Sequence, residues 1–252
     1  MPRQAREKSS TGIYHVMVRG INRQKVFIDD GDCIQFIKKI EEAKEKSDFE
    51  FYGYCLMGNH AHLLFREVTE SLSLIMQKIF SRYVYWYNWK YDRFGHLFQE
   101  RFKSEVVEDD SYLLTVLRYI HQNPVKAGIA DSIDDYLWSS YPEYLGKSKL
   151  VDTSFVLKLF SADTQDAIIE FIKFMNLSND DRCLDYKEIH RYSDEEILKA
   201  IEEKFGVKKD SFHLLEQTEM SKVLSYMKLI DGVTIRQLAE ITGVSKYRVE
   251  KA

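Results

Sequence analysis

Two apolar segments separated by a tight turn constrain the fold of this chain more than any other feature of its sequence. Residues 49–57 (FEFYGYCLM) and 60–66 (HAHLLFR) have the composition of β-strands, and the Gly58-Asn59 pair between them is a hairpin signal. Two strands joined by so short a turn run antiparallel, because a parallel pair requires a long crossover. The sequence therefore predicts an antiparallel sheet that contains this hairpin.

The elements around the hairpin indicate an α+β domain in residues 1–150. Further strands are expected over 12–18 and 102–107, and helices over 30–46, 71–91 and 110–122. We expect the last helix to end near Asn123, because Pro124 disfavours helical backbone in the residue before it. The order β-α-β-β-α-β-α, with helices packed on an antiparallel sheet, is typical of the α+β class.

Residues 151–252 are expected to form a separate all-α domain. Helices are predicted over 154–160, 164–175, 193–205 and 218–230, with a linker over 179–187. Residues 233–252 have the pattern of a helix-turn-helix, in which Gly243 makes the turn and Ser245 caps the second helix. The recognition helix would present Lys246, Tyr247 and Arg248 to duplex DNA. The alternative is a helical hairpin used for packing or dimerisation.

The small acidic net charge, taken alone, argues against nucleic acid as a partner. The formal charge is -4 and the pI is near 6.0. However, residues 1–25 contain only one acidic residue and residues 78–103 only two, against six basic residues in each segment. Such local basic surfaces bind phosphate irrespective of the total charge. The candidate DNA contacts in these two segments are Arg19, Arg23, Lys25, Arg82, Lys90, Arg93, Arg101 and Lys103.

Residues 82–90 (RYVYWYNWK) of the predicted helix over 71–91 carry five aromatic residues between Arg82 and Lys90, and this segment has two interpretations. Its rings either pack a core or form a stacking surface for single-stranded DNA.

Several classes of protein are disfavoured by composition. No apolar run is long enough to span a membrane, and the N-terminus lacks the apolar core of a signal peptide. The three cysteines are widely spaced and form neither a disulfide framework nor a zinc motif, which fits a reducing cytoplasm. We therefore expect a cytoplasmic protein with no membrane partner.

The strongest chemical signal is the pair His60 and His62 on a predicted strand. Side chains at positions i and i+2 point to the same face, so both imidazoles can converge on one metal ion. Zn, Mn or Ni suits such a pair, and Mg requires additional oxygen ligands. Two strand histidines are also common as ordinary half-buried residues.

Tyr119 and Asn123 lie one turn apart on a predicted helix. A phenol beside an amide oxygen can supply a nucleophile and a metal ligand to one site. The simpler interpretation is that Tyr119 packs and that Asn123 ends a helix before a proline. Of the other histidines, His15 is expected to be structural, and His121 points away from Tyr119 on the same helix.

Four sequence blocks favour the functional interpretation of these residues over the structural one: GIYHVMVRGINRQKVF, YGYCLMGNHAHLLF, GHLFQERFKS and LRYIHQNPVKAGI. Together they resemble the IS200-type Y1 transposases, and within them the REP-associated tyrosine transposase branch of the HUH single-strand nucleases, over about residues 12–145. The resemblance implies a ferredoxin-like sandwich, Mg²⁺ or Mn²⁺ held by His60, His62 and Asn123, and Tyr119 as the nucleophile. Asn123 departs from the wider family, which often has Gln there. A contact between His96 and DNA is suggested only by this resemblance.

The expected function is that of a metal-dependent single-stranded DNA endonuclease and strand transferase. It would act at hairpin-associated sites through a covalent phosphotyrosine, as a monomer or homodimer, with duplex DNA as a second partner of the C-terminal domain. The alternatives are a non-catalytic, domesticated regulator that binds DNA hairpins, an HxH hydrolase of small molecules, and a replication initiator or relaxase of the same group. The scarcity of histidines counts against the hydrolase.

Overall fold

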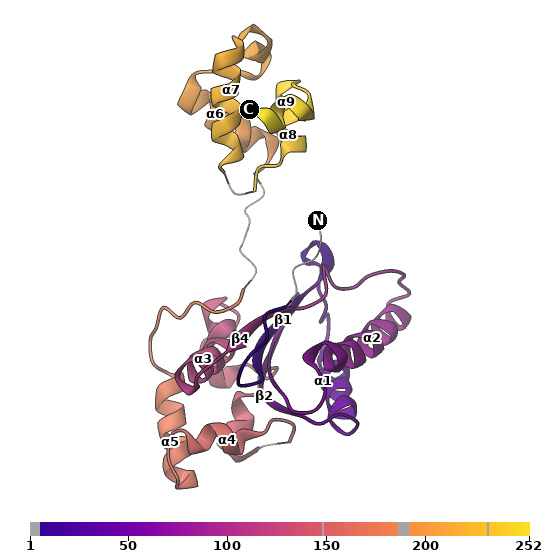
Figure 1. Ribbon diagram of the computed structural model, residues 1–252, viewed down its shortest axis with the longest axis vertical. Coiled ribbons are helices and arrows are strands. Elements are labelled where there is room, and N and C mark those ends of the chain that lie inside the picture. Colours follow the sequence, from indigo (N-terminus) through magenta and orange to yellow (C-terminus); the bar gives the residue numbers. More distant parts are fainter. Residues whose placement is uncertain (1–5, 148, 186–191, 231) are drawn as a thin grey trace. The chain divides into compact units, whose positions relative to one another are not determined.

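A computed structural model describes residues 6–147, 149–185, 192–230 and 232–252, which form two compact units, Met1–Asp185 and Tyr186–Ala252 (Figure 1). The predicted boundary near residue 150 is therefore displaced to residue 185. Helices α4 (Thr153–Lys158) and α5 (Thr164–Met175) belong to the first unit, because Val156, Phe171 and Met175 are buried in its core.

The first unit is built on a four-stranded sheet. Its strands are β1 (Ile13–Arg19), β2 (Phe49–Met57), β3 (His60–Glu67) and β4 (Lys103–Val107), in the order β2-β3-β1-β4. Every neighbouring pair is antiparallel, and β2 and β3 are the predicted hairpin. This prediction from the sequence is confirmed.

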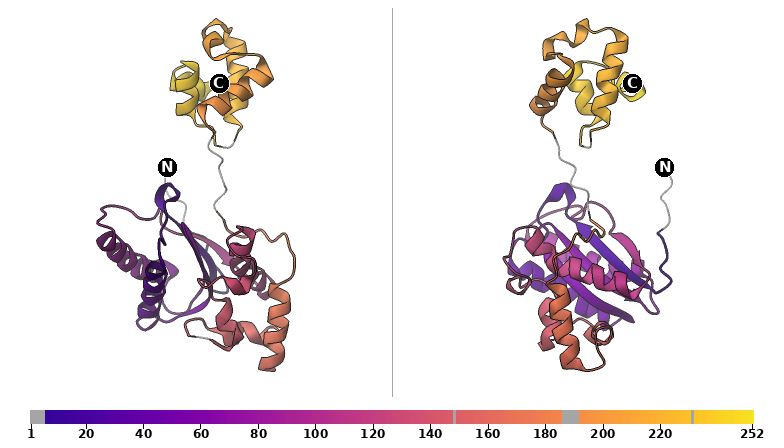
Figure 2. Two further views of the ribbon diagram at one scale, coloured as in Figure 1. Left: turned by 180° about the vertical axis from the view of Figure 1, so that it is seen from behind. Right: turned by 90° about the vertical axis from the view of Figure 1, so that its left-hand side faces the viewer.

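Helices cover both faces of this sheet. Helices α1 (Asp30–Lys44) and α2 (Leu72–Lys90) lie together on one face, and α3 (Asp110–Lys126) lies on the other, as Figure 1 and the left view of Figure 2 show. The chain order β1-α1-β2-β3-α2-β4 with this strand order is the ferredoxin-like arrangement. The expected ferredoxin-like sheet is thus present.

Helix α3 approaches the sheet closely at Gly53 of β2. A Cβ atom added to Gly53 would lie 2.6 Å from Leu117 Cδ1, well inside van der Waals contact. The absence of a side chain at this position allows α3 to settle onto the strands, with Leu113, Leu117 and Ile120 buried beneath it.

The predicted end of α3 near Asn123 is wrong. The helix continues through Pro124 to Lys126, and the Asn123 carbonyl accepts a hydrogen bond from Ala127 N at 2.9 Å. The proline lies in the last turn of the helix, so the missing amide donor costs the helix little beyond that point, and its ring is buried against the core. Asn123 therefore sits inside the helix, with its side chain fixed one turn beyond Tyr119.

The second unit is a small helical domain with a core of its own. It contains α6 (Asp194–Phe205), α7 (Gln217–Lys228), α8 (Ile235–Thr242) and α9 (Lys246–Lys251) around Ile201, Leu224 and Leu238. Short irregular turns at Ile21–Arg23, Ile133–Asp135, Glu143–Lys147 and Lys209–Leu214 complete the secondary structure. Among the described residues, no helix is long and apolar enough to cross a membrane.

The buried His121 gives the first unit a specific response to acid. Burial lowers the pKa of His121 to about 3. From about pH 6.5 downward the unfolded chain binds a proton there that the folded chain does not, so the free energy of unfolding falls with pH by up to ~1.4 kcal/mol per unit. In His121→Phe we expect this slope to be smaller by that amount between pH 4 and 6, measured by urea unfolding. Equal slopes in the two proteins would contradict the assignment.

Candidate active site

Two histidines of β3 face α3 from the sheet. His60 is paired with Arg19 and His62 with Met17 across the β1–β3 ladder, and the alternation of the strand turns both imidazoles to the same side. Their ring centroids are 5.1 Å apart. The spacing i, i+2 therefore produces the convergence that the sequence suggested.

Helix α3 brings Tyr119 and Asn123 over these rings. The Tyr119 ring lies 5.6 Å from that of His62, and Asn123 Nδ2 lies 3.3 Å from His62 Nε2. The structure thus gathers all four of the residues singled out for chemistry, two from a strand and two from a helix that lies across it.

Burial keeps both imidazoles neutral. It lowers the pKa of His60 to about 4, against the smaller opposing effect of the Asp185 carboxylate. It also holds the pKa of His62 well below its usual range, and His15 and His60 nearby act in the same direction. A neutral imidazole is the form that binds a metal ion, so the pair is in its ligating state at neutral pH.

The side chains present fit a small divalent cation with one adjustment. His60 Nδ1 is 2.6 Å from Asn59 Oδ1, and since that oxygen only accepts, Nδ1 donates and Nε2 keeps its lone pair for a ligand. Asn123 presents its amide nitrogen to His62, so it binds metal only after the amide turns its oxygen inward. No group of three or more His, Cys, Asp and Glu that suits a metal occurs in the described part of the chain.

Residues 177–185 lie as a strap across α3. Arg118 donates two hydrogen bonds to Asp181 at 2.8 and 3.0 Å, and Tyr119 OH donates to Asp185 Oδ2 at 2.8 Å. Tyr119 is only 8% exposed beneath this strap, and burial together with the Asp185 carboxylate raises its pKa. The sequence predicted a linker over 179–187. Asn179, Asp181 and Asp185 instead contact α3 at Lys126, Arg118 and Tyr119, and 186–187 lie outside the described residues.

His15 also belongs to the site, although sequence reasoning treated it as structural only. It is fully buried on β1, and its Nε2 lies 3.0 Å from His62 Nδ1. The available signal was its place in an apolar strand, IYHVMVR, where an imidazole needs a polar partner. By contrast, His121 bonds Ser140 Oγ at 2.8 Å and is no part of the site, as expected from its direction on the helix.

Four of the predicted DNA contacts come from β1, β4 and the loop after β1. Arg19 is the β1 partner of His60, and the loop that carries Arg23 and Lys25 donates two backbone hydrogen bonds to Gly58 in the β2–β3 turn. Lys103 pairs with Met17, which is also the β1 partner of His62. These four basic residues therefore lie on the strands and the loop that border the histidines.

The remaining basic residues of this set are placed on or after α2. Lys90 is bound to Asp29 and Asp32 at 2.7 and 2.8 Å, and Arg82 lies 3.7 Å from Glu42. Arg93 donates to Gln24, and Arg101 lines a cavity of about 680 Å³ with His96 and three phenylalanines. Their contact with DNA stays a prediction.

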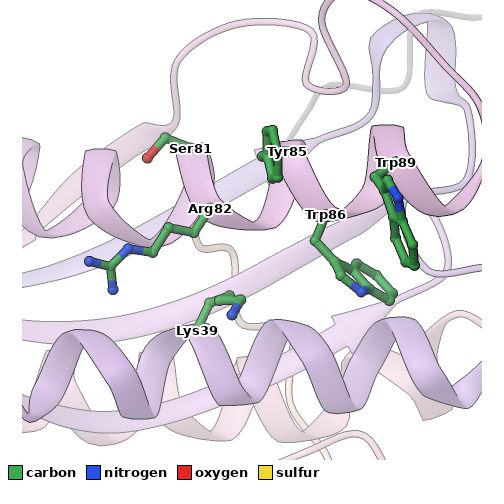
Figure 3. Close-up of a pocket in the computed structure, with 6 residues that line it drawn as sticks. All are labelled: Lys39, Ser81, Arg82, Tyr85, Trp86 and Trp89. Carbon is green, nitrogen blue, oxygen red and sulfur yellow. The ribbon is translucent and has the colours of Figure 1, made fainter.

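The rings of the aromatic helix are partly in the core and partly exposed, and stacking of DNA on the exposed ones stays a prediction. Tyr83 and Tyr87 are buried in the core, whereas Tyr85 and Trp89 are 79% and 75% exposed. The exposed rings and Trp86 line a groove of about 410 Å³ with Arg82 of α2 and Lys39 of α1 (Figure 3).

In the second unit, α8 and α9 are joined by the turn that the sequence predicted. Gly243 has φ 72°, and the Ser245 side chain caps α9. Lys246, Tyr247 and Arg248 are exposed on the first turn of α9, while Val249 is buried. Binding of DNA by this pair of helices stays a prediction.

The fold and the arrangement of its side chains define a ferredoxin-like domain in which a helix-borne tyrosine faces paired strand histidines. Comparison with known proteins agrees: residues 8–123 match the family described as Transposase IS200 like. A putative REP-associated tyrosine transposase of Haemophilus influenzae is 25% identical over 152 residues, covering 56% of this chain and 86% of the relative. A solved structure of a REP-associated tyrosine transposase bound to a REP hairpin has the same fold, with a TM-score of 0.52, 17% identity, and coverage of 61% of this chain and 96% of that one.

We expect the ion pair between Arg118 and Asp181 to hold the strap over Tyr119. Arg118 and Asp181 are 10% and 13% exposed, so removing the carboxylate leaves a nearly buried guanidinium unpaired, at a cost of about 3 kcal/mol. In Asp181→Ala we expect faster hydrogen exchange over 177–185 and faster nitration of Tyr119, read by peptide mass spectrometry. Glu170→Ala, which breaks the exposed pair with Lys173, is the control and should change neither rate. Equal rates in all three proteins would show that Asp181 does not hold the strap.

Proposed function

We propose that this protein is a metal-dependent single-stranded DNA endonuclease and strand transferase that acts at hairpin-associated sites. The observation that carries the proposal is the meeting of Tyr119 with two neutral imidazoles, His60 and His62, on one face of the sheet. The named activity of the Haemophilus influenzae relative and the REP hairpin bound in the solved structure support it. The match of residues 8–123 to the IS200-like family supports it further.

The residues of the chain have distinct parts in the proposed reaction. His60, His62 and, after its amide turns, Asn123 hold Mg²⁺ or Mn²⁺, which when bound polarises the scissile phosphate and stabilises charge on its oxygens. The Tyr119 oxygen forms a bond to phosphorus as the bond from phosphorus to the 3′ oxygen breaks. The phenolic proton passes to the Asp185 carboxylate 2.8 Å away, and the 3′ oxygen takes a proton from water. The bond energy is retained in the phosphotyrosine, so another 3′-OH can reverse the step.

The first test is a covalent adduct. We expect the full chain, incubated with Mn²⁺ or Mg²⁺ and a single-stranded oligonucleotide that carries a hairpin from its own locus, to form a protein–DNA species stable to denaturing electrophoresis. Tyr119→Phe lacks the attacking oxygen and should form none, and His60→Ala should form at least about 100-fold less. His121→Phe is the control, because His121 is equally buried but touches none of these groups. An undiminished adduct in Tyr119→Phe would contradict the assignment of the nucleophile.

A second candidate function is that of a non-catalytic regulator that binds DNA hairpins. The closed strap favours it, since Tyr119 is almost entirely covered and its hydroxyl is engaged by Asp185. The two functions differ in one measurable way. A regulator binds the hairpin with the same Kd in wild type and in His60→Ala and forms no adduct with any metal, whereas the nuclease forms one.

The second unit is proposed to bind duplex DNA through α9. If Lys246 and Arg248 contact phosphates, Lys246→Ala and Arg248→Ala should each weaken binding to a duplex flank and reduce the slope of log K against log salt by about 1. Hairpin cleavage should be unchanged. Lys199→Ala, an exposed lysine of α6, is the control. If duplex affinity is the same in all four proteins, α8 and α9 serve packing or dimerisation instead.

A further inference from the structure

His15 makes a contact that neither packing nor the proposed chemistry has so far explained. It lies on β1 with no exposed surface, and its Nε2 is 3.0 Å from Nδ1 of His62. Its other ring nitrogen, Nδ1, has no hydrogen-bond partner among the described residues, and its nearest ionic neighbour is Glu105 Oε2 at 3.9 Å. Three polar side chains from β3, β1 and β4 thus lie in a row on one face of the sheet.

The protons of these rings can be assigned from their partners. Asn123 offers its amide nitrogen, a donor only, to His62 Nε2, so Nε2 accepts and the proton of a neutral His62 is on Nδ1. That N–H then donates to His15 Nε2, which must be the acceptor. The proton of a neutral His15 is therefore on Nδ1, the nitrogen that faces the Glu105 carboxylate.

Glu105 is held firmly in this position. It is the β4 residue directly opposite His15 in the ladder, and its carboxylate accepts hydrogen bonds from Tyr112 OH at 2.7 Å and from Leu184 N at 3.1 Å. The second of these contacts comes from the strap. The negative charge is thus fixed on the side of His15 that is remote from His62.

We propose that Glu105 and His15 form a positioning relay that fixes the tautomer and the ring orientation of His62. The carboxylate favours the proton on His15 Nδ1, which leaves His15 Nε2 to accept from His62 Nδ1. His62 Nε2 is consequently always the unprotonated nitrogen, and it faces Asn123. Polar partners behind a ligating imidazole raise its affinity for metal in this way. The inference rests on the proposed function, because it assigns His62 Nε2 as a metal ligand.

The relay is tested with variants of the full chain and Mn²⁺ alone as the probe. His15→Phe keeps a ring of similar volume but removes the acceptor, and we expect Mn²⁺ affinity, measured by calorimetry and electron paramagnetic resonance, to fall about 10–100-fold. His15→Gln restores an acceptor oxygen and should recover most of the loss. Glu105→Gln keeps the shape but not the charge, so its loss should be smaller than that of His15→Phe. His121→Phe, the matched control, should bind Mn²⁺ as wild type does.

A second measurement does not depend on metal binding at all. In ¹⁵N-histidine spectra of the metal-free protein, we expect His62 to carry its proton on Nδ1 in wild type and to shift toward the Nε2-protonated form in His15→Phe. A wild-type His62 protonated on Nε2, or a folded His15→Phe with unchanged tautomer and Mn²⁺ affinity, would overturn the relay. If wild type binds no Mn²⁺ but shows the Nδ1 tautomer, the metal proposal fails while the relay stands. If His15→Phe does not fold, the wild-type tautomer and His15→Gln decide.

Discussion

The packing of α3 on the histidine face of the sheet is the contact on which the rest of the site depends. The ladder between β1 and β3 decides which way His60 and His62 point, and a slip of one residue would turn both toward α1 and α2. Gly53 lets α3 come close enough for Tyr119 to reach these rings. The continuation of α3 past Pro124 then holds Asn123 over the same pair. Strand register and helix approach together make a site that no single element contains.

Burial under α3 and the strap has opposite consequences for the two kinds of group in the site. It makes the imidazoles better ligands, because a lowered pKa keeps His60 and His62 neutral. It makes Tyr119 a weaker acid, because the same desolvation, together with Asp185, raises the pKa of its phenol. The same burial therefore favours metal binding by the imidazoles and disfavours deprotonation of the phenol. Within the proposed mechanism, the phenol therefore gives its proton to Asp185 only as its oxygen bonds to phosphorus.

The sequence predicted what local rules determine and missed what distant contacts determine. The β2–β3 hairpin, the shared face of His60 and His62, and the adjacency of Tyr119 and Asn123 follow from turn length and from the periods of strand and helix. The strap over Tyr119 could not be read from residues 179–185, because its hydrogen bonds reach back 63 and 66 residues. The contact between His15 and His62 spans 47 residues and depends on strand register. The end of α3 was predicted wrongly, because the residue before a proline usually leaves the helical conformation. Here the packing of α3 keeps Asn123 helical, and the helix continues through Pro124.

The basic residues expected to contact DNA also differ in their surroundings, which the sequence does not reveal. Arg82 and Lys90 of α2 were expected to bind phosphate, but the ammonium group of Lys90 is already paired with the carboxylates of Asp29 and Asp32. Arg19, Arg23 and Lys25 instead come from the strand and the loop next to His60. Arg19 is in register with His60, and the loop of Arg23 and Lys25 is tied to the turn that precedes His60. If a DNA strand crosses the proposed site, Arg19 and this loop are therefore placed beside it, and the exposed rings of Tyr85 and Trp89 line a groove with Lys39 of α1.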